Sequence, residues 1–156
     1  MAEKTGTTAE KLGISFKEGV VESIHGINEV QKEIVNLARD TVTNALSATG
    51  EVTDEGTTVV KEMFKGAISA SQEVGADVAL TTHAVSKGII MGLNDLGSDL
   101  VKASSSTVKA AVQVASEVGA DVGLVARKSA DGILQATKEI GGNAETVAQA
   151  VFEGAI

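Results

Sequence analysis

Acidic, aliphatic and glycine residues return along the chain at a fixed spacing of 22 residues. An acid followed by an aliphatic residue marks each unit, at Glu29-Val30, Glu51-Val52, Glu73-Val74, Asp95-Leu96, Glu117-Val118 and Glu139-Ile140. From the third copy onward a glycine follows the pair, at Gly75, Gly97, Gly119 and Gly141. Each unit of a repeat must bury its apolar face against its neighbours, so the repeat decides the architecture before any single residue does.

Each unit divides into two elevens that keep one pattern of polarity. When the elevens are counted from residue 10, their third and tenth positions are mostly apolar and their seventh is small or apolar. Spacings of four, three and four residues are those of one helical face, and no segment keeps the two-residue alternation of a strand. The pattern therefore predicts an all-α fold, with long antiparallel amphipathic helices in a bundle built from 11- and 22-residue repeats.

The ends of these helices are marked by glycine or threonine followed by an Asp or Asn that can cap the next helix. The strongest signals lie near 50–54, 97–99 and 141–143, and breaks there alone give three helices of roughly 40 residues and a short C-terminal one. Residues 75–77 and 119–121 carry the same signal. Breaks there as well give the alternative, an array of about seven helices of about 20 residues each.

The recurring acids and glycines bear on this choice. Breaks at 75 and 119 would place Glu73 and Glu117 in a last helical turn, where the helix dipole disfavours negative charge. The breaks at 97 and 141 do the same to Asp95 and Glu139, so this argument does not separate the two arrangements cleanly. We favour the long helices, while the glycines at 75 and 119 stay open as turns or as contact points within a helix. Gly66, Gly88 and Gly132 fall at one aligned position beside the apolar face. Small residues there predict close packing of neighbouring helices, which offsets a helix-propensity cost of about 1 kcal/mol per glycine.

The composition limits which residue types can form the core and indicates the compartment of the protein. The chain is 43% hydrophobic but only 2% aromatic, and it has neither proline nor cysteine, so Ala, Val, Ile and Leu must form the core. Without cysteine there is no disulfide framework, thiolate zinc site or thiol nucleophile. No apolar run has the length of a signal peptide or a membrane span. We expect a soluble cytoplasmic protein, with a flexible N-terminal tail at 1–9 and a single helical-repeat domain at 10–156.

The charge balance excludes one class of partner. The net charge is −8, and Arg39 and Arg127 are the only arginines. Binding of nucleic acid depends on neutralising phosphates, so we expect no nucleic-acid partner. The same balance disfavours anionic membrane surfaces.

No constellation for catalysis is visible. The two histidines, His25 and His83, have no ligand spacing around them and are expected to be solvated on helix surfaces. The recurring acids lie on the polar side and lack the Glu-x-x-His motif of carboxylate metal sites in bundles. The tract Ser104–Thr107 has no partner for nucleophilic chemistry and is expected to be a surface or frayed stretch. We expect no enzyme, no catalytic or metal-binding residue and no cofactor.

The period of eleven resembles known amphipathic repeats. Exchangeable apolipoproteins, group 3 late-embryogenesis-abundant proteins and synucleins are built from such elevens, and Lys17-Glu18-Gly19-Val20-Val21 resembles a synuclein core sequence. Phasins, the coat proteins of bacterial storage granules, are similar in amphipathic helical composition. The resemblance implies reversible binding to lipid or other hydrophobic surfaces.

Three functions follow as hypotheses. The preferred one is a structural or interaction protein that self-associates through small-residue apolar helix faces, with a second copy or another helical protein as its partner. The alternative is an apolipoprotein- or phasin-like protein that binds a lipid or granule surface reversibly. A small-molecule or enzymatic bundle is the third, and it requires a pocket with convergent polar groups.

Overall fold

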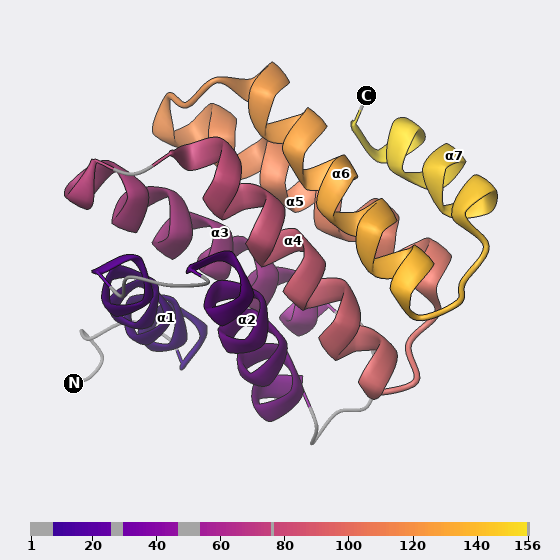
Figure 1. The fold of residues 1–156 in the computed structure, drawn as a ribbon, viewed down its shortest axis with the longest axis horizontal. Coiled ribbons are helices and arrows are strands. Elements are labelled where there is room, and N and C mark those ends of the chain that lie inside the picture. The colour runs from indigo at the N-terminus through magenta and orange to yellow at the C-terminus, as the bar shows by residue number, and fades with distance from the viewer. Residues whose placement is uncertain (1–7, 26–29, 47–53, 76, 156) are drawn as a thin grey trace.

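The described residues form seven α-helices and no strand (Figure 1). In a computed structural model, the chain is described at residues 8–25, 30–46, 54–75 and 77–155. The helices are α1 (Thr8–His25), α2 (Val30–Leu46), α3 (Asp54–Val74), α4 (Val78–Asp95), α5 (Leu100–Val118), α6 (Val122–Glu139) and α7 (Ala144–Ala155). The prediction of an all-α fold is confirmed.

The prediction of helices of roughly 40 residues is wrong, and the alternative of about seven shorter helices is the observed arrangement. The longest helix, α3, has 21 residues. Gly75 and Gly119 have φ angles of +72° and +75°, in the left-handed region that ends a helix and that glycine enters without a steric cost. The expected turns at 97–99 and 141–143 are present. The turn expected at 50–54 lies mostly in 47–53, outside the described residues, as do residues 1–7 of the expected tail.

Each helix from α4 to α7 begins on a polar cap placed two residues after the glycine. The Asp77 side chain accepts a hydrogen bond from the Ala79 N–H at 2.9 Å, and Asp99 accepts one from Val101 at the same distance. Asp121 and Asn143 do the same for the N–H groups of Leu124 and Thr146, both at 3.1 Å. Such caps satisfy amide groups that the first turn of a helix leaves unpaired. The repeat therefore encodes a stop and a start every 22 residues.

The helices alternate between two layers (Figure 1). One layer holds α1, α3, α5 and α7, and the other holds α2, α4 and α6; in this view α3 and α5 lie behind α4 and α6. The most extensive packing joins helices of one layer, α2 with α4, α4 with α6 and α1 with α3, rather than consecutive helices. Each helix therefore stacks on the helix two positions before it.

The core lies between the layers and consists of aliphatic side chains and two phenylalanines. Its largest fully buried members are Phe16, Phe64, Ile34, Leu46, Met63, Ile68, Ile89, Ile90, Leu93 and Ile133. Burial of a side chain of this size contributes about 1.5–3 kcal/mol relative to exposure. The apolar faces that the elevens predict are thus directed toward neighbouring helices of the same chain.

Close approach within a layer depends on glycine. A Cβ built on Gly132 of α6 would lie 2.3 Å from the carbonyl oxygen of His83 in α4. On Gly88 of α4 it would lie 2.4 Å from the Val35 carbonyl oxygen in α2, and on Gly66 of α3 it would lie 2.6 Å from that of Gly13 in α1. The predicted role of the aligned glycines in helix packing is confirmed.

Hydroxyl groups are buried within these contacts. Ser104 and Thr107 are 0% and 1% exposed, so the expectation that their tract lies at the surface is wrong. The Thr107 hydroxyl donates to the Ala103 carbonyl at 2.7 Å, one turn earlier in the same helix. A hydroxyl that is bonded within its own helix can be buried at a low cost. Between α4 and α6, Ser86 donates to Ser129 at 2.8 Å.

Thr82 gives a prediction about stability. Its Oγ1 is buried without a hydrogen-bond partner among the described residues. Replacement by valine keeps the shape and removes the unpaired hydroxyl, so Thr82→Val is expected to raise the free energy of unfolding by about 1–2 kcal/mol in urea denaturation. Thr81→Val is the control, because the Thr81 hydroxyl accepts a hydrogen bond from the Ser71 hydroxyl at 2.7 Å. Loss of this hydrogen bond is expected to lower the free energy of unfolding. Equal effects of the two substitutions would contradict this explanation.

Candidate interaction surface

Four of the recurring acids, Glu73, Asp95, Glu117 and Glu139, lie at the C-terminal ends of helices and form ion pairs across each layer. Lys17 pairs with Glu73 at 3.1 Å, Arg39 with Asp95 at 2.6 Å and Lys61 with Glu117 at 3.6 Å. The partners are 56 residues apart in each case, so one base meets the acid of the helix two positions later. A cation beside each acid offsets the unfavourable helix dipole. The dipole argument for long helices fails for this reason.

The fourth ion pair does not have the 56-residue spacing of the other three. Glu139 pairs at 2.7 Å with Lys87, whereas the 22-residue spacing of the bases places His83 opposite it. Lys87 stands one helical turn after His83 in α4. The ion pair is thus kept by a different residue, and the position of the usual base holds an imidazole.

The Arg39–Asp95 pair has the most complete geometry. The guanidinium donates two hydrogen bonds to the carboxylate, from Nε at 2.6 Å and from an Nη at 2.8 Å. These bonds hold the pKa of Asp95 below its usual value and raise the pKa of Arg39, while the partial burial of the pair opposes both shifts. Both side chains are more than a third exposed, so solvent screens the interaction.

A dependence of stability on pH follows. The folded-state pKa of Asp95 is depressed, so the stabilisation is present above the unfolded value of 3.8 and is lost as the pH falls through the lower folded value. Arg39→Gln is expected to lower the free energy of unfolding by at most about 1 kcal/mol at neutral pH. In urea denaturation at several pH values, the difference from wild type should shrink once Asp95 is protonated. A difference that stays constant into strong acid would contradict this assignment.

The far end of the array carries a stacking surface that no described helix covers. In the layer of α1, α3, α5 and α7, Val20, Phe64 and Val108 follow one another at 44-residue spacing and are each 0% exposed. The next residue in that series, Phe152, is 69% exposed. In the other layer, Leu46 and Ile90 are buried, and the next residue in their series, Leu134, is only partly buried.

A hollow of about 360 Å³ lies on this surface between α6 and α7. We call its lining the end face; it consists of Gly123, Ala126, Arg127, Ala130, Leu134, Ala148, Val151, Phe152 and Ala155. Most of these side chains are small. The positions on α6 repeat, 44 residues later, the side of α4 that packs against α6. The end face is therefore a helix-stacking surface that none of the described helices covers.

At the opposite end of the array, the outward side of α2 is polar. Asp40 and Asn44 of α2 hold the places that Ala84 and Gly88 hold in α4, 44 residues later. Both are exposed, whereas Ala84 and Gly88 are buried. Repeat proteins commonly end in a polar surface of this kind, which keeps the last unit in contact with water. The two ends of the array thus differ in character.

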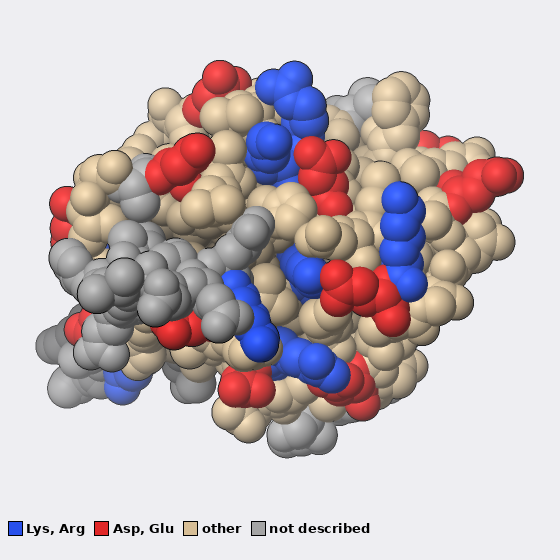
Figure 2. All heavy atoms as spheres, viewed as in Figure 1, with Lys and Arg blue, Asp and Glu red and all other residues tan. Residues whose placement is uncertain are grey.

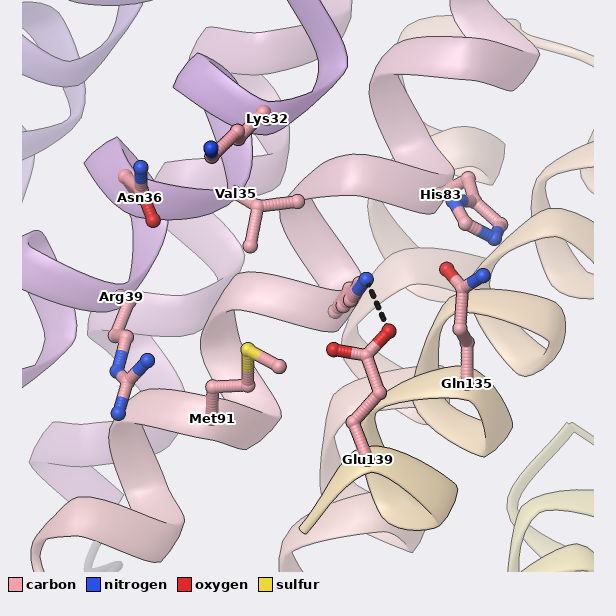
Figure 3. Close-up of a pocket in the computed structure, with 9 residues that line it drawn as sticks. Lys32, Val35, Asn36, Arg39, His83, Met91, Gln135 and Glu139 are labelled. Atoms are coloured by element: carbon pink, nitrogen blue, oxygen red, sulfur yellow. Dashed lines mark hydrogen bonds and ion pairs between the residues drawn. The ribbon is translucent and has the colours of Figure 1, made fainter.

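A second hollow opens on the outer side of the α2–α4–α6 layer. It is a cleft of about 450 Å³ whose lining includes Lys32, Arg39, His83, Lys87 and Glu139 (Figure 3). His83 is half-buried in this cleft rather than fully solvated, and burial, aided by nearby lysines, lowers the pKa of its imidazole. The side chain of His25 lies outside the described residues.

The described residues hold no group of three or more His, Asp or Glu placed to bind a metal ion. Within the same ranges, no helix is long and apolar enough to cross a membrane. No protein-family model and no curated protein matches the chain. The resemblance to apolipoproteins, late-embryogenesis-abundant proteins and synucleins therefore stays a prediction.

Sequence reasoning named none of the residues of the end face as functional. The signal was present in the 44-residue series, because Phe152 continues a line of core residues at Val20, Phe64 and Val108, and Arg127 stands 44 residues after His83 and 88 after Arg39. Both lines become informative only after the stacking of each helix on the second one before it is known. The spacing of 44 residues has no meaning for helices that stack on their immediate neighbours.

Proposed function

We propose that this chain is a non-enzymatic structural protein that self-associates, and that the end face is the contact between copies. The observation that carries the proposal is Phe152, which is exposed at a position where the preceding residues of its series are buried. A large aromatic side chain beside a hollow lined by small residues is the usual composition of a binding hot spot. Exposure of such a surface to water costs free energy that contact with a partner recovers.

The polar end of the array argues against head-to-tail stacking of copies. In such stacking, α2 of one copy would lie against α6 of the next, with Asn44 in the place that Gly88 holds against α2. A Cβ at Gly88 would already lie 2.4 Å from a backbone oxygen, so the larger Asn44 side chain does not fit there. The adjacent Asp40 would also lose its water.

A two-fold arrangement avoids this clash because the end face then meets its own copy. With the axis between α6 and α7, α6 of one copy lies against α7 of the other, and each Phe152 enters the hollow of its partner. Such a contact closes after two copies. Charge supports the pairing, since Arg127 of α6 then faces the α7 that carries Glu145 and Glu153. Opposite charges at the rim orient partners more than they tighten binding.

The lipid-surface alternative has weaker support. The apolar faces of the helices form the core of the array. Among the residues whose exposure the structure describes, the exposed large hydrophobic residues are spread over five helices rather than gathered on one: Ile14, Leu80, Val101, Val118, Val122 and Phe152. A protein that lies on a lipid surface needs one continuous apolar face.

Light scattering coupled to gel filtration tests the proposal. We expect a molar mass that rises with concentration toward twice the 15.8 kDa of one chain and then stops rising. A mass that continues to rise would indicate head-to-tail filaments. A compact monomer at every concentration would contradict self-association, and flotation of that monomer with neutral vesicles would favour the lipid-surface alternative.

A further inference from the structure

The hollow on the end face has the size and lining of a pocket for a small apolar molecule. Its volume is about 360 Å³, and pockets that bind small molecules begin at about 300 Å³. Val151, which is 4% exposed, and the partly buried Leu134 line it together with alanine side chains. Figure 2 shows the surface between α6 and α7 as mostly tan, without a cluster of charged side chains. The lining therefore suits a flexible apolar group such as an alkyl chain.

One cation lines this hollow, and it has no partner within the described part of the chain. Arg127 is the only charged residue of the end face, and its side chain is exposed. It makes no ion pair or hydrogen bond with any described residue. Asp131, one helical turn later, pairs with Lys128 at 4.0 Å instead. By contrast, Arg39 pairs with Asp95 at the same position of the repeat, 88 residues earlier. The Arg127 guanidinium is thus free to meet an anion from outside the chain.

The proposed two-fold contact brings an apolar group and a negative charge to the same place. Phe152 of one copy enters the hollow of the other, and Arg127 faces the α7 that carries Glu153, the residue next to Phe152. A second copy therefore offers an apolar side chain and a carboxylate together. A single small molecule that carries both groups matches the hollow and its arginine in the same way.

We propose that the hollow binds one molecule of a linear monocarboxylate of medium chain length, and that this ligand competes with the second copy for the end face. The alkyl chain lies on Leu134 and Val151. The carboxylate pairs with Arg127, because the fork of guanidinium N–H groups matches two carboxylate oxygens. The competition rests on the proposed function, whereas the binding itself depends only on the hollow and on Arg127. A ligand that occupies only the uncovered end face shifts the protein toward the single chain by mass action.

Leucine methyl groups report on binding directly. We use ¹³C-methyl-leucine protein at a concentration where light scattering gives the mass of one chain. Decanoate, below the concentration at which it forms micelles, is expected to shift the Leu134 signal in a saturable way. The signal of Leu93, a core residue of α4 that is 2% exposed, should stay unchanged.

A series of ligands separates the two parts of the site. From hexanoate to octanoate to decanoate, each added CH₂ group is expected to tighten binding by up to roughly fourfold, which is the effect of burying one such group. Acetate supplies only the charge and 1-octanol only the chain, so each should bind at least about tenfold more weakly than octanoate. Equal binding of acetate and octanoate would overturn the role of the hollow.

An arginine variant tests the anion contact. Arg127→Gln is expected to weaken decanoate binding about tenfold, because charge-assisted hydrogen bonds are lost. Lys109→Gln on α5 is the matched control, since it is exposed, changes the net charge equally and should bind as wild type. An unshifted Leu134 signal, or equal binding by Arg127→Gln and wild type, would overturn the ligand site, whatever the oligomeric state of the protein.

Light scattering at a higher protein concentration tests the competition. Where the wild type has twice the mass of one chain, decanoate is expected to lower the molar mass toward 15.8 kDa. A constant mass while the Leu134 signal shifts would overturn the competition. A protein that has the mass of one chain before any ligand is added would contradict the proposed function, and this result is obtained without the ligand, so the two failures are distinguishable.

Discussion

Phe152→Glu is expected to convert the associated protein into a monomer. The side chain is 69% exposed within one chain, so its replacement leaves the fold intact, but in the proposed contact it fills the hollow of the partner. A buried carboxylate without a partner in that hollow is strongly unfavourable. The loss of an aromatic hot spot alone costs at least about 2 kcal/mol, or roughly a 30-fold increase in the dissociation constant. Sedimentation equilibrium measures this constant.

Ile14→Glu is the matched control for this substitution. Ile14 is 58% exposed on α1, at the other end of the array, and it is also a large hydrophobic residue. Its replacement by the same acid should leave the dissociation constant unchanged. Equal weakening by both substitutions would indicate that the change in net charge, rather than the end face, controls association. Circular dichroism of both variants should match wild type.

Gly132→Ala is expected to destabilise the fold by about 2 kcal/mol, although alanine is the better helix former. The added Cβ would lie 2.3 Å from the His83 carbonyl oxygen and 3.2 Å from the Lys87 backbone nitrogen. Both atoms belong to the backbone of α4, so a rotamer change cannot relieve the contact. The two helices must move apart, and the packed surface between them is lost. Urea denaturation measures the change in the free energy of unfolding.

Gly123→Ala, a substitution in the same helix, is expected to stabilise the fold. A Cβ at Gly123 would meet only the Asp121 carboxylate, at 3.7 Å. Without a clash, the gain in helix propensity should raise the free energy of unfolding by up to about 1 kcal/mol. Gly123 lies on the end face, so both glycine variants should be measured in the Phe152→Glu background, where the chain is monomeric. Stabilisation by both substitutions would contradict the close approach of α4 and α6.

Much of the fold could be predicted from the sequence, because helix periodicity and small residues act locally. The apolar positions of the elevens face the core, and Gly66, Gly88 and Gly132 do lie at helix contacts. The length of the helices could not be settled in this way. Two local rules conflicted, since the glycine at 119 signals a stop while Glu117 beside it is unfavourable at a helix end. The ion pair with Lys61 resolves the conflict, and it depends on a helix 56 residues away.

The candidate surfaces were beyond sequence reasoning for a related reason. Phe152 is exposed because no described helix packs over it, and the same type of position is buried at Phe64. A pattern that repeats assigns the same environment to both residues. Likewise, the burial of Ser104 follows from the packing of α5, whereas its polarity alone suggests the surface. The sequence repeat identifies the helices that stack on one another. Which helix face stays exposed depends on the order in which these helices stack.

The most direct test of self-association through the end face uses the absence of cysteine, which allows one nitroxide label at a chosen position. Gln149 lies on α7 beside the end face, and Lys11 lies on α1 at the opposite end; both are exposed. Pulsed electron spin resonance on labelled Gln149→Cys is predicted to show a short distance between copies, and labelled Lys11→Cys should show none. A short distance found only in a mixture of the two labelled proteins, or in no sample, would contradict the two-fold contact.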